Sequence, residues 1–171
     1  MPSATVVPEP EPEPEPEQTP APKPVPAPER VAIASIGLDL PVRAVGVAAD
    51  GQMELPKDPA VVGWYKFGPA PGDREGSVVL GGHLDSREYG VGPLVKLRKL
   101  RQGAVIEVRA GGSTTTYRVE GVRDVDKREL AVGDLFARTG ARRLHLVTCG
   151  GPYDAKGGGY RDNLVVSASP Q

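Results

Sequence analysis

The chain has 171 residues, a quarter of them charged, and a formal net charge of −1 at pH 7. This length suits one hydrophobic core, and the single cysteine excludes an internal disulfide. No run of about 18 apolar residues is present, so we predict no membrane helix in this sequence. Met1–Val7 lacks the basic and apolar parts of a signal peptide, so we predict no cleaved leader here.

Residues 1–29 are rich in proline and glutamate. Eleven of the nineteen prolines lie between Pro2 and Pro28, and Glu alternates with Pro from Glu9 to Glu17. Such a segment buries almost nothing and forms neither helix nor sheet ladder, so we predict an extended linker of about 80 Å. Because a tether needs an attachment, we hypothesise that a membrane anchor precedes it in the native protein. A disordered tail without a task is the alternative.

Residues 30–171 are predicted to form one domain, with 20 basic and 16 acidic side chains. The basic residues are scattered and not interleaved with aromatic ones, so we expect no nucleic-acid partner. Short β-branched runs dominate, and they predict a mainly β fold with seven or eight strands in a closed or nearly closed barrel. The predicted strands cover 31–36, 41–47, 77–83, 104–109, 115–126, 144–149 and 163–168. Short helices are predicted over 59–65, 93–100 and 132–137, and Trp64 and Phe67 are expected to pack in the core or against a helix.

The strand predicted over 144–149 ends on the only cysteine, Cys149, and runs into two glycines. Because side chains alternate along a strand, His145 and Val147 share the face of Cys149, whereas Thr148 lies on the opposite face with Leu144 and Leu146. His145 is about 13 Å from Cys149 along this strand, too far to take its proton. A buried and inert thiol is the alternative interpretation.

Two other strands bring polar residues to their ends. His83 lies in a Gly-Gly-His-Leu-Asp run, and Arg161 opens the last strand. Only a thiolate is a good nucleophile, and a nearby imidazole and guanidinium favour it. We therefore predict Cys149 as the nucleophile and His83 as the general acid and base. Arg161 and the backbone N–H of Gly150 would stabilise the oxyanion formed on an attacked amide carbonyl, although an ordinary turn also explains the glycines.

Together these segments resemble a known family. Leu146-Val147-Thr148-Cys149 resembles the Thr-Leu-x-Thr-Cys signature of sortases, Gly82-His83 resembles their histidine segment, and Arg161 lies where their arginine opens the final strand. The resemblance covers about residues 30–168, and His145 departs from the signature, which often has Thr there. The phrases Gly-Gly-His-Leu-Asp-Ser, Leu-Val-Thr-Cys-Gly-Gly-Pro-Tyr and Tyr-Arg-Asp-Asn are most similar to actinobacterial class F sortases, with class E next.

This resemblance implies an eight-stranded sortase-type β-barrel and a cysteine transpeptidase on the outer face of the cell membrane of a Gram-positive bacterium. Cys149 would cleave a Leu-Pro-x-Thr-Gly-like sorting signal between Thr and Gly through a thioacyl enzyme. The surface protein would then pass to an amine of a peptidoglycan precursor or a pilin. Thr148 and Gly150 are the candidate substrate-binding residues, although Thr148 could equally support the strand. Asp85 is expected to cap a turn rather than to orient His83.

No cofactor is expected. The two histidines lack the spacing of joint metal ligands, and the acidic residues lack a calcium-loop pattern, so we predict calcium-independent activity.

Two alternatives stay open at this point. An L,D-transpeptidase also joins Cys and His on a β-rich scaffold, but that family places Gly before its Cys and Arg two residues after it. Here Thr148 precedes the thiol, and Arg161 follows twelve residues later. The second alternative is a non-catalytic, wall-tethered β-barrel binding module in which Cys149 is inert.

Overall fold

The computed structural model describes residues 24–171, so most of the predicted linker lies outside the described residues. The barrel strands are β1 (Pro28–Ile33), β2 (Leu38–Val45), β3 (Val62–Tyr65), β4 (Ser77–Gly81), β7 (Val105–Ala110), β8 (Ser113–Asp126), β9 (Arg143–Asp154) and β10 (Gly159–Pro170). The helices are the 3-10 turns η1 (Ala34–Ile36) and η2 (Pro93–Lys99) and the short α-helix α1 (Val132–Leu135). Two further strands, β5 (Asp85–Ser86) and β6 (Gly90–Val91), form a separate small sheet.

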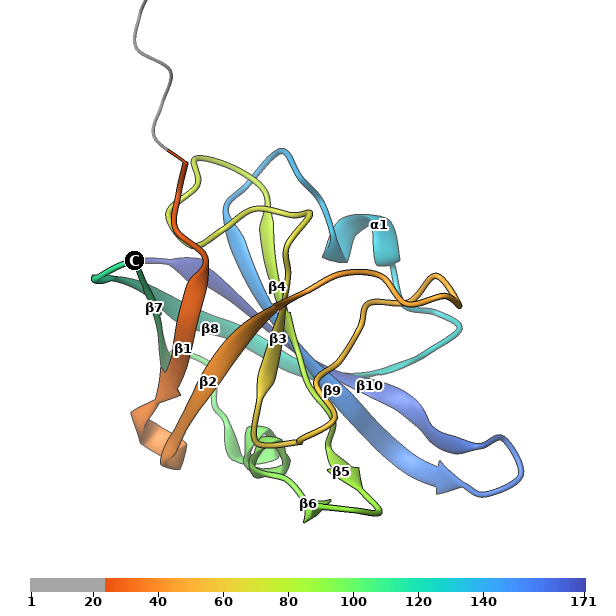
Figure 1. Cartoon of the computed structure of the whole chain (residues 1–171). Coiled ribbons are helices and arrows are strands. Elements are labelled where there is room, and N and C mark those ends of the chain that lie inside the picture. Colours follow the sequence, from red (N-terminus) through yellow and green to blue (C-terminus); the bar gives the residue numbers. More distant parts are fainter. Residues whose placement is uncertain (1–23) are drawn as a thin grey trace, which may run out of the picture.

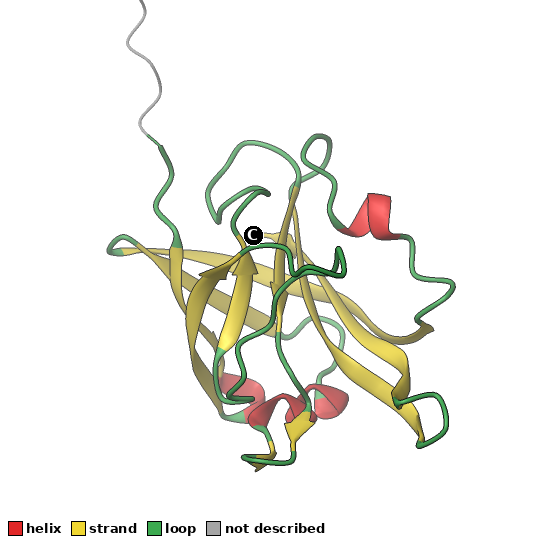
Figure 2. Cartoon of the chain, turned by 45° about the vertical axis from the view of Figure 1, so that its right-hand side comes forward, coloured by secondary structure: helices red, strands yellow, loops and turns green. Residues whose placement is uncertain are grey.

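The eight long strands close into a barrel in the order β1-β2-β3-β4-β9-β10-β8-β7 (Figure 1). Two of the pairs are parallel, β2 with β3 and β4 with β9, and the others are antiparallel. The small β5–β6 sheet and η2 lie at one end of this barrel, and the β9–β10 hairpin extends beyond its wall (Figures 1 and 2). The predicted closed, mainly β barrel with short helices is confirmed.

Alternating residues of the long strands fill the barrel interior. Leu144 and Leu146 of β9 are fully buried there, and Leu94 and Leu97 of η2 close one end of the core. The predicted helix over 93–100 is therefore confirmed as a 3-10 helix. None of the helices within residues 24–171 is long and apolar enough to cross a membrane.

Several boundaries differ from the prediction. The helix predicted over 59–65 is wrong, because Val62–Tyr65 is strand β3, held by parallel pairing with β2 and antiparallel pairing with β4. A run of four residues is too short to show a helical or strand period, so the long-range pairing decides its conformation. The first strand ends at Ile33, since η1 follows and Gly37 closes it in the left-handed region at φ 61°. β1 begins at Pro28, slightly before the predicted domain start at residue 30.

The two aromatic residues near β3, Trp64 and Phe67, differ in burial. Trp64 is buried, and its Nε1 donates a hydrogen bond to the carbonyl of Pro69 at 3.0 Å. Phe67 is 51% exposed, so the expectation that it could lie in the core is wrong. It follows β3 on the surface, where its ring packs edge-on against Tyr65.

Candidate active site

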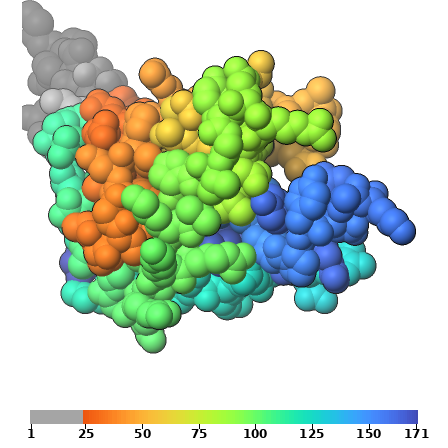
Figure 3. All heavy atoms as spheres, turned by 90° about the horizontal axis from the view of Figure 1, so that it is seen from below, coloured from red at the N-terminus to blue at the C-terminus, as the bar shows by residue number. Residues whose placement is uncertain are grey.

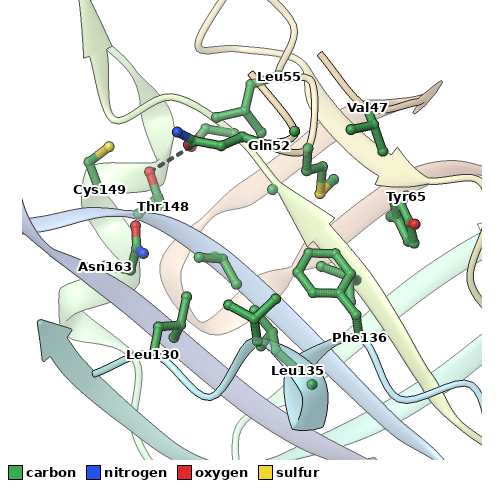
Figure 4. A pocket seen from close by; sticks show the side chains of 18 residues that line it. Val47, Gln52, Leu55, Tyr65, Leu130, Leu135, Phe136, Thr148, Cys149 and Asn163 are labelled. Atoms are coloured by element: carbon green, nitrogen blue, oxygen red, sulfur yellow. Dashed lines mark hydrogen bonds between the residues drawn. The ribbon is translucent and has the colours of Figure 1, made fainter. Parts of the chain in front are cut away.

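A cavity of about 540 Å³ lies on the outer face of the barrel, over β4 and β9. Val79 of β4 and Val147 and Cys149 of β9 line its floor. The connection from β2 to β3 and the connection from β8 to β9, which contains α1, supply the walls. Figure 4 shows this lining, which includes Val47, Leu55, Tyr65, Leu130, Leu135 and Phe136. The cavity is thus an apolar groove with a thiol in its lining.

Cys149 is half-buried and lies inside β9, not at its end as the sequence suggested. The strand continues to Asp154 because pairing with β10 continues past the glycines through an irregularity in register. Asn163 of β10 is the cross-strand partner of Cys149, and both line the groove (Figure 4). Burial raises the pKa of the Cys149 thiol, and the charge of Lys127 lowers it less than burial raises it. The resting site therefore favours the neutral thiol.

Strand alternation puts Thr148 on the face opposite Cys149, yet Thr148 also contributes to the lining of the groove, and it is only 3% exposed. Its hydroxyl donates a hydrogen bond of 2.8 Å to the carbonyl of Gly82, drawn as the dashed line in Figure 4. The backbone N–H of Gly82 in turn donates to the carbonyl of Val147 at 3.1 Å. Thr148 therefore fixes the backbone directly before His83, which supports the interpretation that it stabilises the strand.

His83 lies two residues after the end of β4 and is half-buried. β4 and β9 are parallel, with Gly81 paired to Val147, so continuing this register brings His83 level with Cys149. The imidazole lies in shallow hollows with Lys57 and Asp85 at the margin of the groove. Within residues 24–171 no hydrogen bond joins His83 to Cys149. The fold thus brings the two residues to adjacent positions without a direct bond.

Arg161 is exposed on β10, two residues before Asn163, where the register between β9 and β10 is irregular. Its carbonyl accepts a hydrogen bond of 3.2 Å from the backbone N–H of Lys127. The hydrogen bonds of Arg128, and to a lesser extent the charge of Arg161, hold the pKa of the Asp126 carboxyl well below its usual range. Arg161 thus lies next to an acidic residue of β8, and its predicted role at the thiol stays a prediction.

Comparison with known proteins places this barrel and its cysteine in a family. The sortase domain family model matches residues 31–171. The chain belongs to the sortase family. Sortases are cysteine transpeptidases that act at the cell envelope, so the enzyme prediction is confirmed and the L,D-transpeptidase alternative is left without support. Comparison with curated protein sequences gave no match.

Solved sortases share the fold at low sequence identity. Sortase A from Corynebacterium diphtheriae is 19% identical with a TM-score of 0.62, and the match covers 86% of this chain and 61% of that one. Sortase A from Listeria monocytogenes is 19% identical with a TM-score of 0.62, covering 84% and 86%. Sortase C1 from Streptococcus agalactiae is 22% identical with a TM-score of 0.63, covering 84% and 66%. This sortase therefore spans less than two thirds of some relatives, and its substrates and partners are matters for proposal.

Gly150 of this sortase is buried against an ion pair. A Cβ there would lie 2.7 Å from Asp124 Oδ1 and 3.2 Å from Arg98 Nη2, and these two side chains pair at 3.2 Å. The absence of a side chain at 150 therefore lets β9 pass close to the contact between η2 and β8. Its predicted role as an oxyanion donor stays a prediction.

Two residues near the sortase site were not found from the sequence. Asn163 and Lys127 are placed beside Cys149 only by the register of β8, β10 and β9, which no local motif reveals. The expectation that Asp85 caps a turn is wrong, because its carboxylate accepts a hydrogen bond from the Tyr160 hydroxyl, while Ser86 accepts one from the N–H of Tyr89.

No group of three or more His, Cys, Asp or Glu side chains in the described part of the sortase could hold a metal ion. Calcium independence nevertheless stays a prediction.

Proposed function

We propose that this sortase cleaves a Leu-Pro-x-Thr-Gly-like sorting signal between Thr and Gly and transfers the surface protein to an amine of the cell envelope. One observation carries the proposal: the apolar groove of about 540 Å³ contains the thiol of Cys149 in its lining. An extended peptide rises about 3.3 Å per residue, so its Leu and Pro side chains can pack in the groove while the Thr carbonyl reaches the sulfur.

The chemistry then proceeds in two halves. Cys149 Sγ attacks the Thr carbonyl, the carbon–sulfur bond forms, and the carbon–nitrogen bond breaks as the departing glycine amine takes a proton from His83. The acceptor amine next attacks the thioacyl carbonyl, loses its proton to His83, and displaces the thiolate. Because the pKa of Cys149 is raised, only a minor fraction of the resting enzyme holds the thiolate needed for the first step.

Charge on the carbonyl oxygen needs donors already aimed at it. Arg161 and the backbone N–H of Gly150 are the proposed donors, and Thr148 shapes the groove beside them. Lys127 is a neighbouring cation whose charge already acts on the sulfur.

The segments that carry the sequence resemblance support a class F sortase, with class E as the alternative. The acceptor is a peptidoglycan precursor or a pilin lysine. A membrane anchor preceding the described residues would hold the full-length enzyme at the outer face of the membrane, with the Pro- and Glu-rich linker between anchor and barrel.

A fluorogenic Leu-Pro-x-Thr-Gly peptide tests this function, with triglycine as the amine and intact mass spectrometry to detect the thioacyl adduct. We expect Cys149→Ala to show neither turnover nor adduct. His83→Ala should lose about 10²-fold to 10⁴-fold in kcat/KM, because general acid–base catalysis contributes about that much. Arg161→Ala should lose about 10²-fold, as expected for an oxyanion donor.

Arg142→Ala removes another exposed arginine, on the connection before β9, and is the matched control that should keep full activity. Turnover that survives Cys149→Ala would remove the nucleophile from the mechanism. Hydrolysis without any transfer to triglycine would contradict the transpeptidase assignment.

A further inference from the structure

A hydrogen bond joins the loop of His83 to the hairpin that carries Cys149. The Tyr160 hydroxyl donates to Asp85 Oδ2 at 2.6 Å, across 75 positions of sequence. Asp85 lies two residues after His83 in β5, and Tyr160 directly precedes Arg161 in β10. The β5–β6 sheet does not belong to the barrel, so this bond connects two parts that no strand ladder joins.

Both partners come from segments that are held in place. On one side, Asp85 pairs with Val91 across the small sheet, and the N–H of Gly92 donates to the carbonyl of Leu84 at 2.8 Å. On the other side, Tyr160 pairs with Tyr153 across the hairpin, and their rings pack edge-on at 5.3 Å. The hydrogen bond therefore fixes one backbone segment relative to the other.

We propose that the Asp85–Tyr160 hydrogen bond is a clasp that positions the His83 loop against the catalytic hairpin. Asp85 and Tyr160 are positioning residues: they set where the imidazole lies relative to the thiol, and neither reacts with substrate. Seen from below, the green segment around β5 and β6 and the blue hairpin project from the same side of the molecule (Figure 3). The clasp connects these two segments. Its positioning role rests on the function proposed above.

A positioning bond matters here because, within residues 24–171, no hydrogen bond holds the His83 side chain itself. β4 ends at Gly81, and the hydrogen bond from Thr148 to Gly82 is the last tie from the barrel wall to this segment. Asp85 is the next point at which the segment is tied to the strands of the nucleophile. His83 thus lies between two ties, one to β9 through Thr148 and one to β10 through Tyr160.

The charges around the clasp provide a readout that is independent of turnover. The hydrogen bond to Asp85 raises the pKa of Tyr160, which keeps the hydroxyl protonated as a donor. Three effects act on the pKa of Cys149. The largest is burial, which raises it; the charge of Lys127 lowers it, and the charge of Asp85 raises it. His83 and Arg161 are the other titratable groups near this face. Removal of the Asp85 charge should therefore shift thiol alkylation to lower pH.

Tyr160→Phe and Asp85→Ala each break the bond, and Asp85→Asn keeps a carbonyl acceptor while it removes the charge. We expect the first two to lower kcat by about 10-fold to 100-fold with KM within about twofold, because small misplacements of catalytic groups cost about that much. The double variant Asp85→Ala/Tyr160→Phe should be no slower than the slower single variant, as expected of two groups in one interaction. Asp85→Asn should retain most of the kcat and shift the pH profile of iodoacetamide alkylation of Cys149 to lower pH.

Tyr153→Phe is the matched control, since it removes a hydroxyl from the same hairpin on a residue that is 63% exposed, and it should leave kcat unchanged. Hydrogen exchange of residues 82–92 should accelerate in Tyr160→Phe and not in Tyr153→Phe. Unchanged exchange in Tyr160→Phe, or multiplying losses in the double variant, would overturn the clasp. If the wild-type enzyme cleaves no sorting peptide, the proposed function fails. Hydrogen exchange of residues 82–92 and alkylation of Cys149 would still show whether the Asp85–Tyr160 bond fixes the His83 loop.

Discussion

The two halves of β9 have different surroundings. From Arg143 to Val147 the strand pairs with β4 on one side and β10 on the other, and Leu144 and Leu146 are fully buried. Beyond Thr148 it pairs with β10 alone, as one arm of a hairpin. Cys149 is thus placed just past the point where the strand loses one neighbour. The barrel half fixes the position of the thiol, and the missing neighbour leaves room for His83.

The largest effect on stability is expected in the barrel half. Leu146→Ala removes a fully buried side chain from the core and should lower the free energy of unfolding by about 2–5 kcal/mol. Tyr153→Ala, in the exposed hairpin half, should cost less than about 1 kcal/mol. Urea denaturation measures both. Equal losses in the two variants would show that the hairpin is as much a part of the core as the barrel half.

The next effect lies at the junction of the two halves. Thr148→Val keeps the shape of the side chain but leaves the carbonyl of Gly82 without its buried donor, which should cost about 1–3 kcal/mol. Peptide cleavage should also slow, because the backbone before His83 loses its tie to β9. Thr148→Ser restores the hydroxyl and should recover both stability and rate. Full stability in Thr148→Val would show that the hydrogen bond does not hold the junction.

A smaller and local effect is expected in the hairpin half. Gly151 has φ 70°, and a Cβ there would lie 2.2 Å from Asp162 Oδ2. Gly151→Ala should therefore cost about 1–2 kcal/mol, the typical penalty of a left-handed residue with a side chain. Hydrogen exchange should increase in residues 150–160 and stay unchanged in the barrel. Gly121→Ala, where a Cβ meets nothing within 4 Å, is the control, and similar exchange in both variants would contradict the local strain.

The faces of β9 could be predicted because alternation is a local property. It correctly places Leu146 in the core and Cys149 in the lining of the groove. The order of nucleophile, histidine and arginine segments also sufficed to indicate the family. These features depend on residues close together in sequence, and so one chain is enough to read them.

The remaining features depend on register between distant segments. The strand β3 exists because its four residues pair with β2 and β4, and the continuation of β9 past Gly150 depends on β10. The hydrogen bond between Asp85 and Tyr160 likewise requires two separate hairpins to meet. No propensity or motif encodes such distances, so the sequence indicated a helix in place of β3 and turns at the other two places.

The smallest effect concerns His145, which shares the outer face of Cys149 but belongs to the barrel half. It is buried, its Nδ1 lies 3.1 Å from Ser167 Oγ, and its pKa is lowered, chiefly by burial and then by the charge of Arg143. The unfolded chain takes up this proton near pH 6.5, and the folded chain takes it up only at lower pH, so stability is full above pH 6.5 and falls as the pH drops below it. Urea denaturation across this range should show the loss in the wild type and a flatter dependence in His145→Gln. If the stability of His145→Gln depends on pH as that of the wild type does, another group causes the loss. If the variant changes the pH profile of peptide cleavage, His145 also affects the catalytic half.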